Sequence, residues 1–124
     1  MKSVSLAHAA KYKDKVLGYA PYKGECAAGL QLVFSEAGKP LGLTSTWKKG
    51  KQVKGNSIPA GTAIASFKNG RYWKHAGVLI RETPSGLLVW DQWAGQPWHQ
   101  RTLRFKEGNT SDGSNNGNLF FVID

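Results

Sequence analysis

The feature that most constrains this fold is the order of two hydrophobic patterns along the chain. Apolar residues recur at helical spacing before residue 38, whereas from residue 62 onward they follow the short runs typical of β-strands. We expect strands at 62–67, 75–82, 87–93, 99–105 and 118–123. Helices followed by a strand meander favour an α+β fold with a five-stranded, mainly antiparallel sheet, not a Rossmann-type alternation.

The clearest single element is the helix that precedes the strands. Gly38 lies where a helix commonly ends, and Pro40 prevents its continuation. The helix therefore begins near Glu25 or Cys26, which places the only cysteine in its first turn. Its apolar residues share one face: Ala27, Leu30, Phe34 and Ala37.

The remaining segments are less regular. Residues 5–17 carry a fair helical pattern that ends at Gly18. Residues 39–60 show no sustained period and predict a long surface loop, and the polar stretch 108–118 predicts another.

Composition limits the class of protein. The 124 residues are 40% hydrophobic and 20% charged, which predicts one globular domain spanning 1–124, expected to be a monomer. A single cysteine excludes an intramolecular disulfide framework and a Cys-rich zinc module. The apolar stretch after Met1 is too short for a secretory signal. We therefore expect synthesis in the cytosol, without membrane insertion, and a leaderless route if the protein acts outside the cell.

Cys26 is the candidate nucleophile. A lone cysteine is by default a small buried hydrophobe, but a thiol in the first turn of a helix lies at the positive end of the helix dipole, which favours the thiolate. The free Cys26 amide could also donate to a developing oxyanion. Tyr22, in the preceding loop, is a weaker candidate for the second donor.

His75 and Asp91 are the candidate base and its orienting carboxylate. His75 opens an apolar strand and could simply cap its edge, whereas Asp91 interrupts the next apolar strand and needs a partner there. The two side chains share a face only if the connecting turn has an odd length. A three-residue turn at 84–86 satisfies this condition, and a two-residue turn at 84–85 would place them on opposite faces.

The charge predicts a polyanionic partner. The net charge is +9, and nine Lys or Arg residues occur between Ala37 and Arg81 without one acid. Such a surface could concentrate bacterial cell wall or nucleic acid, and neighbouring aromatic rings could stack on bases or sugars. We predict that substrate contacts come from Trp47, Lys48, Tyr72, Trp73, Gln92 and Trp93.

The motifs resemble those of the papain-like peptidoglycan hydrolases of the NlpC and CHAP groups. Gly24-Glu25-Cys26 opens a helix, and His75-Ala76-Gly77-Val78 and Asp91-Gln92-Trp93 lie on successive strands. The sequence is more similar still to small bacterial proteins of this superfamily, some of them type VI secretion amidase effectors, from about residue 15 to the end. Trp93 stands where CHAP domains have Asn, and Ala20 where a papain-type Gln would lie. Stretches shared with these proteins are Trp47 with Gly50, 61–65, 69–72, 91–93 and 114–116.

The resemblance implies a papain-like core and cleavage of amide bonds in peptidoglycan stem peptides without a cofactor. It assigns Cys26 as nucleophile, His75 as base and Asp91 as orienting residue, with a thioester acyl-enzyme. It also implies a secreted antibacterial effector or lysin that acts in the periplasm or cell wall of target bacteria, with a possible cognate immunity protein.

Three alternatives stay open at this stage. A nucleic-acid-binding module would bind DNA or RNA in a salt-dependent manner, and Cys26→Ala would leave that binding unchanged. No recognised motif supports this alternative. A catalytically inactive papain-like domain would have a thiol no more reactive than free cysteine. A metal site built from Cys26, His75 and Asp91 would hold only three ligands and is the weakest alternative.

Overall fold

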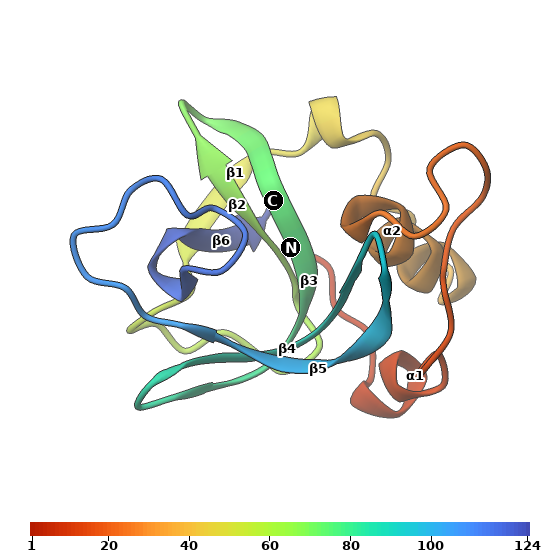
Figure 1. Cartoon of the computed structure of the whole chain (residues 1–124), viewed down its shortest axis with the longest axis horizontal. Coiled ribbons are helices and arrows are strands. Elements are labelled where there is room, and N and C mark those ends of the chain that lie inside the picture. Colours follow the sequence, from red (N-terminus) through yellow and green to blue (C-terminus); the bar gives the residue numbers. More distant parts are fainter.

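The strands form one six-stranded antiparallel sheet in the order β1-β6-β2-β3-β4-β5 (Figure 1). The computed structural model describes residues 1–124. Two short 3-10 turns, η1 (Thr44–Thr46) and η2 (Gly117–Leu119), join the elements. The helices are α1 (Leu6–Ala10) and α2 (Cys26–Glu36). The strands are β1 (Lys49–Gln52), β2 (Ala63–Lys68), β3 (Arg71–Thr83), β4 (Gly86–Trp93), β5 (Gln96–Arg104) and β6 (Phe120–Ile123). None of the helices is long and apolar enough to cross a membrane.

The sheet curls so that its two faces bury separate apolar clusters (Figure 1). One cluster packs Leu30, Val33 and Phe34 of α2 against small residues of β2 and β3. The other lies on the opposite face and includes Leu79, Val89 and Phe120. The alternation of inward positions along β2, β3 and β4 supplies both faces, as expected for strands buried on each side.

The α2 helix has the predicted bounds. It begins at Cys26 after an extended N-cap at Glu25. It ends where Gly38 adopts φ +75°, and the Lys39 N–H then donates to the Phe34 carbonyl, as in a glycine-terminated helix. Cys26 therefore does lie in the first turn.

Gln92 on β4 fixes the segment that leads into α2. Its side-chain amide is fully buried, accepts from the Leu17 N–H at 2.9 Å, and donates to the Leu17 and Glu25 carbonyls at 3.0 and 2.8 Å. Gly29 makes room for this side chain, because a Cβ at that position would lie 2.7 Å from Gln92 Nε2. Three hydrogen bonds of Gln92 thus tie β4 to both ends of the segment from Leu17 to Glu25, which leads into α2.

The predicted first helix, 5–17, is wrong in length, because α1 ends at Ala10. The chain beyond it bonds to β5 instead. The Asp14 N–H donates to the Trp98 carbonyl at 2.8 Å, and the Trp98 N–H donates to the Lys15 carbonyl at 2.9 Å. Tertiary backbone pairing therefore overrides the local helical pattern.

The loop predicted at 39–60 contains an edge strand, so the sheet has six strands, not five. β1 reads Lys-Gly-Lys-Gln and is mostly exposed, so it has no alternating apolar pattern for sequence reasoning to detect. It forms because its backbone pairs with β6. Lysines on such an edge also oppose pairing with a second molecule.

The β3–β4 hairpin reaches the required register by a different route from the one predicted. Thr83 pairs with Gly86, so the turn has two residues, and the predicted three-residue turn is wrong. An irregularity between Leu79 and Arg81 then shifts the pairing by one residue. Since a one-residue shift exchanges the faces of a strand, this bulge returns the side chain of His75 to the face that carries Asp91.

The contact between Gly29 and Gln92 predicts that alanine at position 29 changes the stability of the protein in the direction opposite to the usual one. Alanine normally stabilises a helix by about 1 kcal/mol relative to glycine. Here Gly29→Ala should destabilise the protein by about 1–3 kcal/mol, because the new methyl group overlaps Gln92. In a Gln92→Ala background the same change should become stabilising. Chemical denaturation of the four proteins measures both effects, and additive changes would contradict the packing described.

Candidate active site

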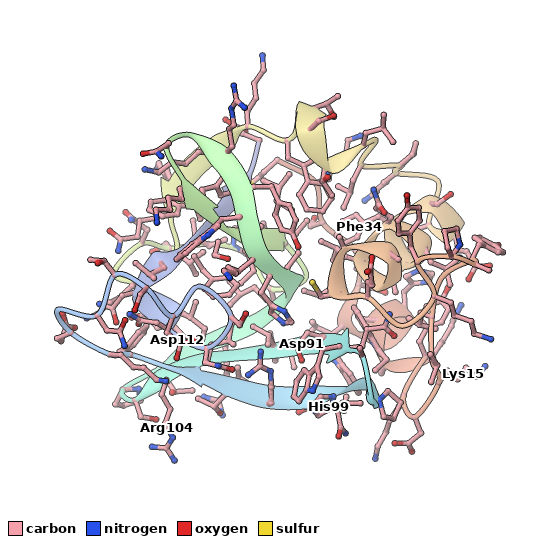
Figure 2. All side chains as sticks on the ribbon, turned by 45° about the horizontal axis from the view of Figure 1, so that its top comes forward. Lys15, Phe34, Asp91, His99, Arg104 and Asp112 are labelled. Carbon is pink, nitrogen blue, oxygen red and sulfur yellow. The ribbon has the colours of Figure 1, made fainter.

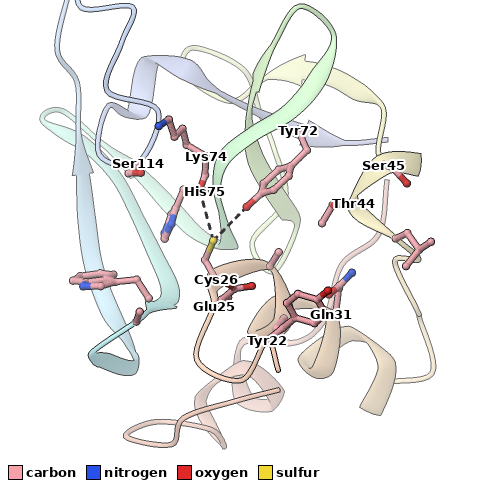
Figure 3. A pocket seen from close by; sticks show the side chains of 15 residues that line it. Tyr22, Glu25, Cys26, Gln31, Thr44, Ser45, Tyr72, Lys74, His75 and Ser114 are labelled. Atoms are coloured by element: carbon pink, nitrogen blue, oxygen red, sulfur yellow. Dashed lines mark hydrogen bonds between the residues drawn. The ribbon is translucent and has the colours of Figure 1, made fainter. Parts of the chain in front are cut away.

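An open cleft of about 710 Å³ lies beside the first turn of α2 (Figure 3). The strand β3 and the end of β4 form one side of it, and η1 forms another. Polar and charged side chains converge there from these segments, whereas the rest of the lining is small or aromatic. Its lining residues include Tyr22, Glu25, Cys26, Tyr72, Lys74 and His75.

The Cys26 thiol faces this cleft and is partly exposed. Its Sγ lies 3.3 Å from the Tyr72 hydroxyl and 3.8 Å from the Lys74 carbonyl oxygen (Figure 3). The Cys26 backbone N–H, at the start of the helix, has no acceptor in the chain. Two hydrogen-bond donors therefore lie beside the sulfur. The Cys26 N–H has no acceptor in the chain, and the Tyr72 hydroxyl contacts only the sulfur itself.

His75 is held on β3 by both its backbone and its ring. The buried Ser66 hydroxyl accepts from the His75 N–H at 3.1 Å, at the point where the pairing of β2 with β3 is irregular. The ring Nε2 lies 2.5 Å from Asp91 Oδ2. Because a carboxylate can only accept, Nε2–H is the donor in this contact, and Nδ1 is the ring nitrogen that Asp91 does not engage.

Asp91 is completely buried in the interior of the molecule (Figure 2). Its Oδ2 accepts from His75 and also from Arg101 Nε at 2.8 Å, while its Oδ1 has no partner. Opposite it on β3 is Gly77, where a Cβ would come within 3.2 Å of Asp91 Cβ. The absence of a side chain at Gly77 leaves the carboxylate space to reach His75.

Arg101 joins this pair to the wall of the cleft. Its guanidinium donates to the Asn115 side chain and to the Ser114 carbonyl, each at 2.9 Å, and Ser114 lines the cleft. The Trp93 ring covers the guanidinium at 4.6 Å. Arg101 therefore fixes the 114–115 segment relative to Asp91.

The electrostatics favour a thiolate–imidazolium pair. Burial raises the pKa of the Cys26 thiol, but the neighbouring His75 and the hydrogen bond of Tyr72 outweigh it, so the pKa lies below its ordinary value. Burial also lowers the pKa of His75, but the hydrogen bond with Asp91 and the neighbouring Cys26 raise it to about 9. Burial and the neighbouring sulfur raise the pKa of Tyr72, so its hydroxyl keeps its proton as a donor.

The predicted site residues separate into two groups. Cys26, His75, Tyr72, Trp93 and Tyr22 line the cleft. Asp91 lies behind His75, hydrogen-bonded to its ring. The Tyr22 hydroxyl has no hydrogen-bond partner, and it is the Tyr72 hydroxyl that contacts the sulfur.

Four of the residues predicted to contact substrate lie outside the cleft. Gln92 is fully buried and holds backbone, and the buried Trp47 stacks edge-on against Tyr72 and donates to the Leu41 carbonyl. Trp73 lies beneath the ammonium groups of Lys68 and Lys74, away from the sulfur. Lys48 is exposed and does not line the cleft.

Sequence reasoning missed Arg101 and Ser66, which hold Asp91 and His75 in place. Asp91 could have indicated Arg101, because a carboxylate on an apolar strand is costly to bury unless a cation on a neighbouring strand pairs with it. Ser66 gave no signal, because its role depends on an irregularity in the β2–β3 pairing. His, Cys, Asp and Glu side chains form no group of three or more that could hold a metal ion.

Comparison with known proteins defines the family. Residues 1–123 match the family model described as domesticated amidase effector 2. This chain belongs to that family. The match extends to the N-terminus, beyond the region from residue 15 that the motifs indicated, and the predicted resemblance to papain-like amidase effectors is confirmed.

Individual relatives agree with the family. The chain is 36% identical over 107 residues to domesticated amidase effector 2 of Ixodes scapularis, covering 82% of this chain and 72% of that protein. It is 35% identical over 101 residues to a type VI secretion amidase effector 2 protein of Salmonella typhi, covering 68% and 76%. A solved structure of type 6 secretion amidase effector 2 matches 99% of this chain and 94% of its own, with 28% identity and a TM-score of 0.79.

The thiolate–imidazolium pair predicts unusual thiol chemistry. Iodoacetamide should alkylate folded Cys26 at pH 6 at least about tenfold faster than the same cysteine in denaturant, because an ordinary thiol with a pKa near 8.5 is almost fully protonated there. His75→Ala should abolish the difference. The reaction reports one site, since Cys26 is the only cysteine. An alkylation rate that rises only near pH 8.5 in the folded protein would contradict the pair.

Proposed function

We propose that this protein is a cysteine amidase or endopeptidase that hydrolyses amide bonds in the stem peptides of bacterial peptidoglycan. Cys26 is the nucleophile, His75 the general base and acid, and Asp91 the residue that orients His75. The observation that carries the proposal is that a partly exposed thiol and an imidazole line the same open cleft, with a buried carboxylate hydrogen-bonded to the imidazole. Membership of an amidase effector family supports the reaction class.

The reaction we propose is an acyl transfer in two steps. The Cys26 proton resides on His75, and the thiolate attacks the amide carbonyl carbon to form a tetrahedral oxyanion. His75 then gives its proton to the departing amine as the C–N bond breaks, which leaves a thioester on Cys26. His75, now neutral, takes a proton from water as the water oxygen attacks the thioester carbon. The C–S bond then breaks, which releases the carboxylic acid and restores the thiolate–imidazolium pair.

The oxyanion is stabilised by two donors in this proposal. The Cys26 N–H is free at the start of α2, where the helix dipole also favours negative charge. The second donor is the Tyr72 hydroxyl, which already lies 3.3 Å from the sulfur. Tyr72 replaces Tyr22, the weaker candidate from the sequence.

The proposed place of action is the periplasm or cell wall of target bacteria. A relative in Salmonella typhi is named as a type VI secretion effector, which supports secretion into another cell. A producing cell that has peptidoglycan of its own would need protection. We therefore propose a cognate immunity protein that blocks the cleft. The net charge of +9 would attract the protein to the polyanionic cell wall.

Digestion of purified peptidoglycan, read by mass spectrometry, tests the function. Wild type should release new fragments whose masses identify the amide bond, and Cys26→Ala should release none. Tyr72→Phe should lower kcat by about 10²-fold, the usual cost of one oxyanion donor. The matched variant Tyr22→Phe should stay within about threefold of wild type.

The outcomes separate the competing functions. Absence of fragments together with a thiol of ordinary reactivity would leave a catalytically inactive binding domain. Salt-dependent binding to DNA or RNA that Cys26→Ala leaves unchanged, without digestion, would indicate a nucleic-acid-binding module. Equal losses in Tyr72→Phe and Tyr22→Phe would overturn the assignment of the oxyanion donor.

A further inference from the structure

A second groove, of about 390 Å³, runs alongside the catalytic cleft. It lies between residues 18–22 and the outer face of α2, where Leu32, Ser35 and Glu36 line it. Tyr22, Ala28 and Gln31 line both hollows, so the groove and the cleft are direct neighbours. In the close view, Tyr22 and Gln31 lie beside each other below Cys26 (Figure 3). A substrate anchored at Cys26 can therefore extend into this groove.

Two tyrosine rings border the groove and are unusually exposed. Tyr19 is 77% exposed and Tyr22 62% exposed, and neither hydroxyl has a partner in the chain. Gln31 donates through Nε2 to the Gly42 carbonyl, which leaves its Oε1 as a free acceptor. Exposed aromatic faces rimmed by unengaged polar groups are typical of a ligand groove.

The groove differs in charge from the rest of the molecule. The chain carries 17 Lys and Arg residues, yet none of them lines the groove. Its one charged side chain, Glu36, already accepts a hydrogen bond from the Tyr12 hydroxyl at 2.6 Å. The catalytic cleft, in contrast, carries Lys74 and Glu25. Charged parts of a substrate suit the cleft, and an uncharged part suits the groove.

The segment that presents the two rings is held at both ends. The Gly24 N–H donates to the Leu17 carbonyl at 2.9 Å, and Gln92 binds the backbone of both Leu17 and Glu25. Within it, the Tyr22 N–H donates to the Tyr19 carbonyl at 2.9 Å. Binding to this segment thus costs less conformational entropy than binding to a free loop.

We propose that this groove is a glycan subsite, in which Tyr19 and Tyr22 stack against sugar rings of the peptidoglycan strand while the attached peptide occupies the catalytic cleft. This inference rests on the proposed function. Sugar rings have apolar faces and many hydroxyls and bear little charge, which matches aromatic faces, free amide and hydroxyl groups, and the lack of cations. A second stem peptide, which carries carboxylates, lacks a cationic partner in this groove.

A matched pair of substrates tests the subsite. One is a disaccharide-linked stem peptide, and the other is the same peptide without its sugars. Wild type should show kcat/KM about tenfold higher for the sugar-bearing substrate, as expected for about 1.4 kcal/mol of added transition-state binding. Tyr19→Ala should bring the ratio of the two values close to one, and Tyr19→Phe, which keeps the ring, should keep the ratio.

A binding measurement makes the test independent of catalysis. Peptide-free glycan chains should shift amide resonances of residues 18–22 in NMR spectra of Cys26→Ala, and the shifts should be lost in the Cys26→Ala, Tyr19→Ala double variant. A wild-type ratio near one without these shifts would overturn the subsite, as would a ratio unaffected by Tyr19→Ala. A dependence on a second peptide but not on sugar would assign the groove to peptide. Failure to cleave either substrate, with glycan binding intact, would overturn the amidase but not the subsite.

Discussion

The buried carboxylate of Asp91 is the group on which the arrangement of the site depends. A carboxylate without solvent is costly unless cations and hydrogen bonds compensate it, and both partners of this one meet at a single oxygen, Oδ2. His75 supplies one partner from β3, and Arg101 supplies the other from β5. The same guanidinium holds Ser114 at the cleft wall. One buried charge therefore joins three strands and a loop, and it fixes the orientation of the imidazole that faces Cys26.

Irregularities in the sheet, more than its regular pairing, bring these residues together. The bulge between Leu79 and Arg81 places His75 on the same face as Asp91, although the two-residue turn alone would separate them. A second irregularity, between Ala65 and Phe67, coincides with the Ser66 hydroxyl that holds the His75 backbone. On the other side of the cleft, Gln92 holds the start of α2. Two buried polar side chains, Ser66 and Gln92, thus position the reacting groups by binding the backbone of His75 and of the residue before Cys26.

Patterns within a segment predicted well, and features that depend on distant pairing did not. The bounds of α2, the five apolar strands and the separate positions of Cys26, His75 and Asp91 follow from local periodicity, helix termination and the cost of a carboxylate in a strand. The bulge at residue 80 and the short α1 were not predictable in this way, because backbone pairing with β4 and β5 determines them. β1 lacks an apolar pattern altogether. Gln92 and Trp47 are residue types that often occur in binding sites, and only their burial shows that they are structural.

The ionisation state of His75 shows whether the Cys26 thiol, the His75 imidazole and the buried Asp91 carboxylate are coupled. The ring nitrogens of His75 can be followed by ¹⁵N NMR across pH in wild type and in Cys26→Ala. His75 should stay protonated through neutral pH and titrate near pH 9 in wild type. It should titrate lower in Cys26→Ala, where the thiolate is absent. Titration near 6.5 in both proteins would contradict the coupling of thiol, imidazole and buried carboxylate.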